Sequence, residues 1–218
     1  MIVIFDLDDT LYDESGFVGG GFEAVAKILE HEFKLRSTET KKRLFELSEK
    51  YNRKNVFDRF LAERQLYNKK LVNRCIKMYR GHEPKIELYP GALTILNESN
   101  SVSKFIVTDG NKFVQRRKVD ALALWPHFHK IVFTHQYGKA RAKPSMYCFE
   151  KIRSWMKCDF RDMVYIGDDP TKDFVNTKSL GIHTIRVLTG RFRNVKVSNR
   201  HDADKTISCV SEFRIEEI

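Results

Sequence analysis

The hydrophobic positions of the chain follow two different periods in two regions. Between residues 22 and 79 apolar side chains recur three or four positions apart, with no strand-like run among them, which predicts four consecutive amphipathic helices. From residue 85 onward short apolar runs alternate with helical stretches. Strands that alternate with helices indicate βαβ units and hence a parallel sheet. The runs that we expect to form its strands are 105–107, 131–133, 164–166 and 182–187.

The first strand of the sheet is expected at the start of the chain, before the helical region. Residues 2–5, Ile-Val-Ile-Phe, form an apolar run typical of a strand that is buried on both faces. The sequence therefore predicts an α/β fold: a Rossmann-like parallel sheet with helices on both faces, and an inserted all-helical domain. We expect residues 1–14 and 85–218 to form the sheet domain and residues 15–84 the helical domain. The glycine run 19–21 predicts a hinge or a turn.

Polar residues follow three of the predicted strands, at the edge where a parallel sheet places its chemistry. Asp6 and Asp8 come directly after the first strand, and carboxylates this close repel each other unless a cation or a raised pKa relieves them. One capping residue would be enough for an ordinary turn, so this acidic cluster exceeds what a turn needs. The other two strand ends contribute Thr108, Asp109 and Gly110, and Asp168, Asp169 and Asp173.

Together these side chains have the composition of a site for phosphoryl transfer. Carboxylates from two strands suit Mg²⁺, which prefers oxygen ligands and also binds substrate phosphate. Thr108 offers a hydroxyl, and the backbone N–H groups after it can bind an anion where a helix begins. Lys143, which stands before Pro144 at another helix start, adds a positive charge. A metal site, phosphate donors and a cation are the parts that phosphoryl transfer requires.

Four motifs, in order along the chain, resemble those of the haloacid dehalogenase (HAD) superfamily, in the subgroup with a helical cap after the first strand. Residues 6–10 (Asp-Leu-Asp-Asp-Thr) resemble the first motif and residues 108–110 (Thr-Asp-Gly) the second. Lys143-Pro144, with Phe149 further on, resembles the third, and residues 167–173 (Gly-Asp-Asp-Pro-Thr-Lys-Asp) resemble the fourth. The resemblance extends over essentially the whole chain.

This resemblance implies a hydrolase that acts on phosphoric monoester bonds, with a role for each matching residue. Asp6 would attack phosphorus and form an aspartyl-phosphate, while Asp8 would act first as general acid and then as general base. Family members that act on carbon–halogen bonds lack an acid at the position of Asp8, so this residue favours phosphate chemistry. Mg²⁺ would be bound by Asp6, the main-chain carbonyl of Asp8 and Asp168, with Asp173 and Asp169 in support, and phosphate by Thr108, Asp109, Gly110 and Lys143.

Two stretches leave alternatives open. Arg141 or Lys139 can share the role of Lys143, because all three cations lie close together in the chain. The basic stretch from Arg186 to Arg200 either contacts a substrate or partner or is a solvated loop.

Composition limits the other classes of function. The chain has 218 residues and a net charge of +10, which favours anionic partners: phosphorylated metabolites, nucleic acid or acidic membrane surfaces. We expect neither a nucleic-acid nor a membrane partner, because no nucleic-acid motif is visible and no apolar run is long enough to span a bilayer. Without a signal peptide, and with four cysteines that lack disulfide or zinc spacing, a cytoplasmic protein with free thiols is expected.

The expected function is a Mg²⁺-dependent phosphatase that hydrolyses small phosphomonoesters. The first alternative is a phosphomutase of the same superfamily, which would return the phosphoryl group to its substrate. The second is a non-catalytic binding protein that retains the fold. The sequence specifies neither the substrate nor the oligomeric state.

Overall fold

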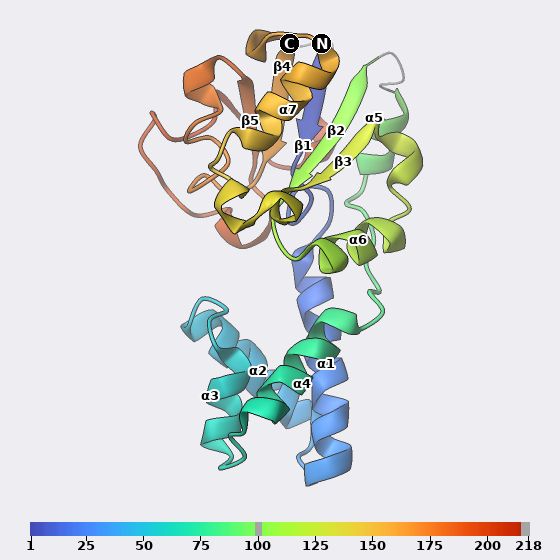
Figure 1. Cartoon of the computed structure of the whole chain (residues 1–218), viewed down its shortest axis with the longest axis vertical. Helices are drawn as coiled ribbons and strands as arrows, with labels where there is room; N and C mark the ends of the chain where they lie inside the picture. The colour runs from blue at the N-terminus through green and yellow to red at the C-terminus, as the bar shows by residue number, and fades with distance from the viewer. Residues whose placement is uncertain (99–101, 215–218) are drawn as a thin grey trace. The chain divides into compact units, whose positions relative to one another are not determined.

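The chain divides into two compact units. A computed structural model describes residues 1–98 and 102–214 (Figure 1). Met1–Glu14 and Ile86–Ile218 together form one unit, which we call the sheet unit, and Ser15–Lys85 form the other, the helical unit. The expected boundaries of the helical domain, 15 and 84, lie within one residue of this division. None of the helices in the described residues is long and apolar enough to cross a membrane.

The described part of the sheet unit is built on six parallel strands in the order β3-β2-β1-β4-β5-β6. β1 lies between β2 and β4 and pairs with both along its whole length. All four of its side chains are buried, as expected for an apolar strand with neighbours on both sides. The strands are β1 (Ile2–Phe5), β2 (Ser103–Thr108), β3 (Lys130–Phe133), β4 (Met163–Gly167), β5 (His183–Val187) and β6 (Lys205–Ile207).

Helices cover both faces of the sheet, which confirms the predicted α/β fold. α7 (Tyr147–Met156) lies on one face, where Phe149 shares a buried cluster with Ile4 and strand residues of β2 and β4. On the other face, α5 (Ala92–Glu98) and α6 (Lys112–Ala121) contact β2 side chains that alternate with those of the cluster. This arrangement buries β1 and places its carboxyl end at the centre of one sheet edge.

The helical unit, all of whose residues the structure describes, contains the four helices that the sequence predicts. Its core gathers one apolar side of each helix, including Phe22, Leu44, Phe60 and Val72. The helices are α1 (Glu14–Phe33), α2 (Ser37–Lys50), α3 (Val56–Glu63) and α4 (Lys69–Gly81).

The hinge expected at the glycine run is wrong, because α1 continues through residues 19–21 without a break. A Cβ atom on Gly21 would lie 2.5 Å from the ring of Tyr79, and one on Gly20 would lie 3.0 Å from His82. The ring of Tyr79 also packs edge-on against Phe17 of α1. The glycines therefore let aromatic side chains at the end of α4 approach the α1 backbone, and this close contact outweighs their preference for a bend.

Candidate active site

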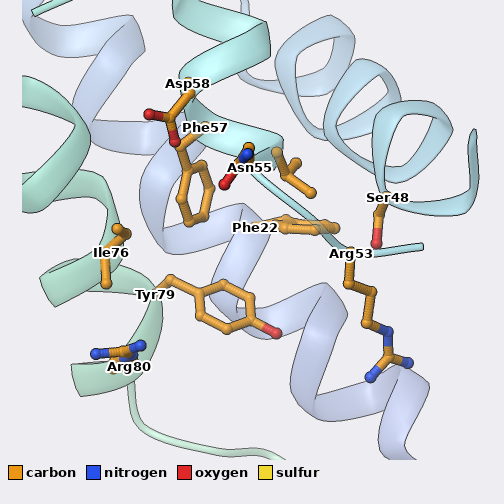
Figure 2. Close-up of a pocket in the computed structure, with 10 residues that line it drawn as sticks. Phe22, Ser48, Arg53, Asn55, Phe57, Asp58, Ile76, Tyr79 and Arg80 are labelled. Atoms are coloured by element: carbon orange, nitrogen blue, oxygen red, sulfur yellow. The ribbon is translucent and has the colours of Figure 1, made fainter. Parts of the chain in front are cut away.

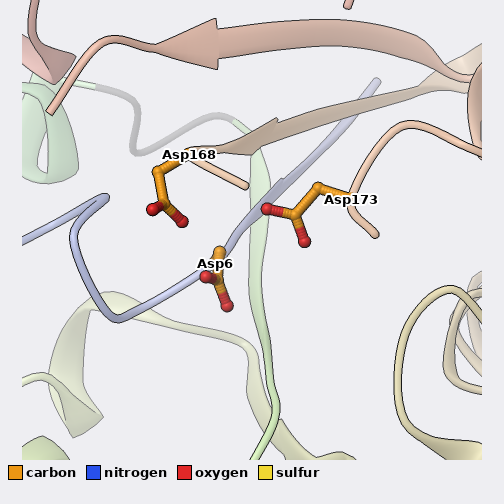
Figure 3. A group of neighbouring side chains, drawn as sticks. All are labelled: Asp6, Asp168 and Asp173. Carbon is orange, nitrogen blue, oxygen red and sulfur yellow. The ribbon is translucent and has the colours of Figure 1, made fainter. Parts of the chain in front are cut away.

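Three buried carboxylates converge at the carboxyl ends of β1 and β4. Asp6 follows β1 directly and Asp168 follows β4, with Asp173 five residues further along. One oxygen of each carboxylate lies within 4.8 Å of the others, and Figure 3 shows the three side chains grouped at these strand ends. All three residues are almost completely buried. We refer to Asp6, Asp168 and Asp173 as the acidic triad.

Lys143 is the lysine that enters the acidic triad. Its Nζ lies 2.7 Å from Asp6 Oδ1 and 2.8 Å from Asp173 Oδ1, and it donates to the hydroxyl of Tyr165 at 2.7 Å. The Tyr165 hydroxyl in turn donates to Asp173 at 3.0 Å. Burial acts to lower the pKa of Lys143, but the charges of Asp173 and Asp6 outweigh it and raise that pKa. The Lys143 ammonium therefore pairs with two of the three carboxylates, those of Asp6 and Asp173.

Without a bound cation, two carboxyls of the acidic triad hold protons more tightly than usual. Burial raises the pKa of Asp6 to about 7, against the opposing effect of Lys143. Burial, together with the charges of Asp6 and Asp173, raises the pKa of Asp168 to about 9. Buried carboxylates that repel one another are relieved either by protons or by a hard divalent cation. The donor set of the acidic triad therefore fits Mg²⁺.

The side chain of Asp8 lies outside the acidic triad and is held by three donors. Its Oδ1 accepts from Lys118 Nζ at 2.7 Å and from the Tyr12 hydroxyl at 2.5 Å, and its Oδ2 accepts from Gln115 Nε2 at 2.8 Å. Lys118 is nearly inaccessible to solvent and lies 3.2 Å from Glu14 as well. Burial acts to lower the pKa of Lys118, but Asp8 and Glu14 outweigh it and raise that pKa. Only the main-chain carbonyl of Asp8 was expected at the metal, so this orientation is compatible with that expectation.

The loop after β2 connects Asp8 to the start of α6. Gln115 also donates to the Thr108 hydroxyl at 2.6 Å, so a single side chain links Thr108 with Asp8. Gly110 has a φ of +121°, a left-handed conformation that favours glycine, and the side chain of Asn111 caps α6 by accepting from the Phe113 amide. The loop thus leads into the N-terminus of α6, where the Phe113 and Val114 amides donate to the side chain of Asn111.

The Asp109 side chain is fixed by two donors. Its Oδ1 accepts from the Thr134 hydroxyl at 2.7 Å and from the Lys143 amide at 3.1 Å. Burial acts to raise the pKa of Asp109, but Lys143 and Lys172 outweigh it and lower that pKa. Asp109 therefore joins the second motif to the third.

The three cations that precede Pro144 occupy different environments. Lys139 and Arg141 are exposed, and the Arg141 guanidinium lies 4.5 Å from the centre of the Tyr147 ring. Lys143 is 6% exposed and contacts the acidic triad. Of these three cations, only Lys143 forms an ion pair with the acidic triad among the described contacts.

Asp9 is clamped by the loop after β5. Its carboxylate accepts from the Glu14 amide at 2.9 Å and the Arg191 amide at 3.4 Å, and the Thr189 hydroxyl donates to its carbonyl. Within the basic stretch, Arg186 is buried, forms an ion pair with Asp202 at 3.1 Å and donates to two loop carbonyls. These contacts give Asp9 a structural role in the turn after β1 and Arg186 a structural role in the loop after β5.

Gly190 is the tightest point of this clamp, and we expect Gly190→Ala to destabilise the fold. Its φ is +61°, and an added Cβ would lie 2.1 Å from Asp9 Cγ. The expected loss is roughly 1–3 kcal/mol of unfolding free energy, measured by urea denaturation, because both backbone strain and the clash oppose the folded state. Gly138→Ala provides the control, since that glycine also has positive φ but open space around it. Equal losses in the two variants would contradict a role for the clash.

The helical unit has a pocket of its own, with a volume of about 280 Å³. Phe22, Phe57 and Tyr79 supply its aromatic lining, and Arg53 and Arg80 lie on either side of Tyr79 (Figure 2). Arg53 has a φ of 61°, uncommon for a residue with a side chain. Aromatic surface combined with a few polar groups is typical of a small-molecule pocket.

Several residues of the site were not found by sequence reasoning. The sequence predicted Tyr165 only as a residue inside a strand, and Lys172 only as a residue between the aspartates of the fourth motif. Gln115 and Lys118 had a usable signal, because they lie three positions apart on α6 and are buried beside Val114 and Val119. Polar residues on the apolar side of a helix indicate buried partners.

A family model described as haloacid dehalogenase-like hydrolase matches residues 3–187. A glyceraldehyde 3-phosphate phosphatase from Methanocaldococcus jannaschii is 27% identical over 97% of this chain and 94% of its own. One from Pyrococcus furiosus is 26% identical over 95% of this chain and 88% of its own.

Two solved structures show the same fold. A HAD phosphatase from Thermococcus onnurineus has a TM-score of 0.63 and 22% identity, covering 97% of this chain and 94% of its own. The HAD-hydrolase YfnB from Bacillus subtilis, solved with bound magnesium, has a TM-score of 0.69 and 17% identity, covering 97% of this chain and 95% of its own.

Proposed function

The chain belongs to the haloacid dehalogenase-like hydrolase family and is a phosphoric monoester hydrolase, and we propose that it is a Mg²⁺-dependent phosphatase of small phosphomonoesters that forms an aspartyl-phosphate on Asp6. The observation that carries this proposal is the acidic triad, with Lys143, at the carboxyl ends of β1 and β4. It combines a candidate nucleophile, a donor set for a divalent cation and a fixed positive charge at one sheet edge. This is the set of parts that phosphoryl transfer uses.

Asp6 is the proposed nucleophile. Its ion pair with Lys143 opposes the effect of burial and so favours the ionised carboxylate that can attack phosphorus. Attack forms a bond between the Asp6 oxygen and phosphorus, and the bond from phosphorus to the leaving alcohol oxygen breaks. The Asp6 amide donates to the Ile166 carbonyl at 2.8 Å, so strand pairing fixes the backbone of the nucleophile.

Asp8 is the proposed general acid and base. It gives a proton to the leaving oxygen, and in the second step it takes a proton from the water that attacks the aspartyl-phosphate. Lys118, Tyr12 and Gln115 position its carboxylate. Gln115 also donates to Thr108, so one side chain links the proposed general acid, Asp8, to the proposed phosphate loop.

The acidic triad is the proposed Mg²⁺ site, together with the main-chain carbonyl of Asp8. Bound there, Mg²⁺ would neutralise the negative charge shared by the carboxylates and the substrate phosphate. Asp169 supports the site indirectly, since its carboxylate accepts from the amide and hydroxyl of Thr171 and so shapes the loop after β4. Thr108, Lys143 and the amides of Asp109 and Gly110 are the proposed phosphate donors.

We expect Mg²⁺ to stabilise the fold, and to do so more strongly as pH rises. Because burial raises the pKa of Asp6 to about 7 and of Asp168 to about 9, both bind protons more tightly in the folded state than in the unfolded state. Without metal, stability therefore falls as pH rises from about 4 through these two values. Mg²⁺ replaces those protons, so the difference in melting temperature between Mg²⁺ and EDTA should grow between about pH 6 and pH 9. A difference that is constant or shrinks over this range would contradict the proposed ligands.

Activity is tested by phosphate release from an aryl phosphate and a panel of phosphomonoesters, with and without Mg²⁺. The relatives named glyceraldehyde 3-phosphate phosphatase make that compound the first metabolite to include. We expect Mg²⁺-dependent release of free phosphate, in contrast to the migration that a phosphomutase would give. Failure of the folded protein to hydrolyse any member of the panel would contradict the proposal.

We further infer that the helical unit is a cap domain that contributes to substrate choice.

A further inference from the structure

Glu14, the first residue of α1, is fixed through both its backbone and its side chain. Its amide donates to Asp9 Oδ1 at 2.9 Å, in the turn that follows β1. Its carboxylate lies 3.2 Å from the Nζ of Lys118, which belongs to α6. Glu14 therefore joins the turn after β1 to the helix after β2, although no role has yet been given to it.

Lys118 shares its ammonium between two carboxylates. Its Nζ lies 2.7 Å from Asp8 Oδ1 and 3.2 Å from Glu14 Oε1, and its side chain is only 3% exposed. A buried ammonium is stable only when opposite charges compensate it, so these two carboxylates determine where Nζ lies. If Glu14 lost its charge, Nζ would shift toward Asp8, and the position of Asp8 would be less well defined.

The two carboxylate oxygens of Asp8 have different surroundings. Oδ1 accepts from Lys118 and from the Tyr12 hydroxyl, and burial together with the charge of Asp8 raises the pKa of Tyr12, so that hydroxyl keeps its proton. Oδ2 accepts from Gln115 Nε2, which also donates to Thr108 in the proposed phosphate loop. Each carboxylate oxygen can accept about two hydrogen bonds. Oδ1 already has two of these donors, whereas Oδ2, linked to the phosphate loop, has capacity for the reacting group.

We propose that Glu14 and Lys118 are positioning residues for general acid–base catalysis, which hold Oδ1 of Asp8 so that Oδ2 exchanges the proton. This inference rests on the proposed function and deepens it. In the first step the proton passes from Oδ2 to the leaving alcohol oxygen as the bond from that oxygen to phosphorus breaks. In the second step Oδ2 takes a proton from the attacking water. Oδ1 keeps its contact with Lys118 in both steps, and the ammonium stabilises the negative charge that Asp8 acquires after the first.

The test compares kcat/KM for an aryl phosphate with kcat/KM for the alkyl phosphate on which the wild type is most active. An aryl alcohol leaves with little protonation, whereas an alkyl alcohol requires the general acid. We therefore expect Lys118→Met to lower kcat/KM for the alkyl phosphate by about tenfold to a hundredfold more than for the aryl phosphate. Glu14→Ala should give a smaller difference of about threefold to tenfold, and Glu14→Gln, which keeps an oxygen acceptor for Lys118, should recover much of it.

Arg116→Met is the matched control for Lys118→Met, because it removes a cation from the exposed side of the same helix. Its ratio of alkyl to aryl kcat/KM should equal that of the wild type. A purely structural role of Lys118 would lower both values equally, so an unchanged ratio in folded Lys118→Met and Glu14→Ala would overturn the inference.

Thermal unfolding of the same samples shows whether each variant is folded. Should Lys118→Met fold poorly, Glu14→Ala and Glu14→Gln provide the same comparison. A ratio that changes in Lys118→Met but not in Glu14→Ala would overturn the role of Glu14. Inactive wild-type protein would count against the proposed function, whereas an active wild type with the same ratio in every variant would overturn this inference alone.

Discussion

Asp6→Asn should abolish turnover and leave the protein folded. An amide cannot attack phosphorus as a carboxylate does, so we expect kcat to fall by a factor on the order of 10⁴ or more. The fold should tolerate the change, because asparagine has nearly the same shape and removes one of three mutually repelling carboxylates, while Lys143 keeps its ion pair with Asp173. The measurements are phosphate release with Mg²⁺ and thermal unfolding of the same samples.

Asp120→Asn is the matched control for Asp6→Asn. It makes the same chemical change at an exposed position near the end of α6, where the carboxylate accepts only from the Trp125 indole in the described contacts. The control should keep wild-type activity. A folded Asp6→Asn protein that retains a substantial share of activity would remove Asp6 as the nucleophile, whatever the role of the metal.

Lys143→Met should cost about 3–5 kcal/mol of unfolding free energy at neutral pH, as expected when one partner of a buried ion pair is removed. The change leaves the carboxylates of Asp6 and Asp173 without the ammonium that lies within 2.8 Å of both. Because Lys143 favours the ionised form of Asp6, its loss raises the pKa of that carboxyl further. The stability deficit should therefore shrink at low pH, where the carboxyl of Asp6 takes up a proton, and shrink when Mg²⁺ is added.

Urea unfolding at acid and neutral pH, with and without Mg²⁺, measures this effect. Lys139→Met is the matched control, because that lysine is exposed in the same stretch of chain. A loss of less than about 1 kcal/mol for Lys143→Met, similar to the control, would show that the pair behaves as a surface salt bridge. Such a result would also weaken the electrostatic argument for a metal at the acidic triad.

The fold and the centre of the site could be predicted because each depends on local sequence patterns. The apolar run of residues 2–5 identifies a buried strand, and Asp6 follows it without an intervening residue. Asp168 follows β4 in the same way. Parallel pairing then brings these strand ends together, so the sequence and general rules of sheet geometry are sufficient.

The parts that could not be predicted depend on contacts between distant segments. Lys118 donates to Asp8, which lies 110 positions earlier in the sequence. Without knowledge of that partner, Lys118 resembles the many solvated lysines on helix surfaces. The glycine run at 19–21 looks like a hinge until Tyr79 is known to pack against it. Likewise, the ordinary-looking loop at Gly190 proves to clamp Asp9. In each case the deciding partner belongs to another element.

The most direct test of the proposed mechanism is whether a phosphoryl group becomes attached to Asp6. An aryl leaving group needs little protonation, so an aryl phosphate should still phosphorylate Asp8→Asn. The variant lacks the general base, so it should hydrolyse the resulting aspartyl-phosphate slowly. Asp8→Asn is allowed to react with the aryl phosphate in the presence of Mg²⁺, quenched in acid and analysed by mass spectrometry. We expect one added phosphoryl group on the peptide that contains Asp6. The Asp6→Asn/Asp8→Asn double variant should carry none. Release of the aryl alcohol by Asp8→Asn without any phosphoryl group on that peptide would contradict the aspartyl-phosphate mechanism.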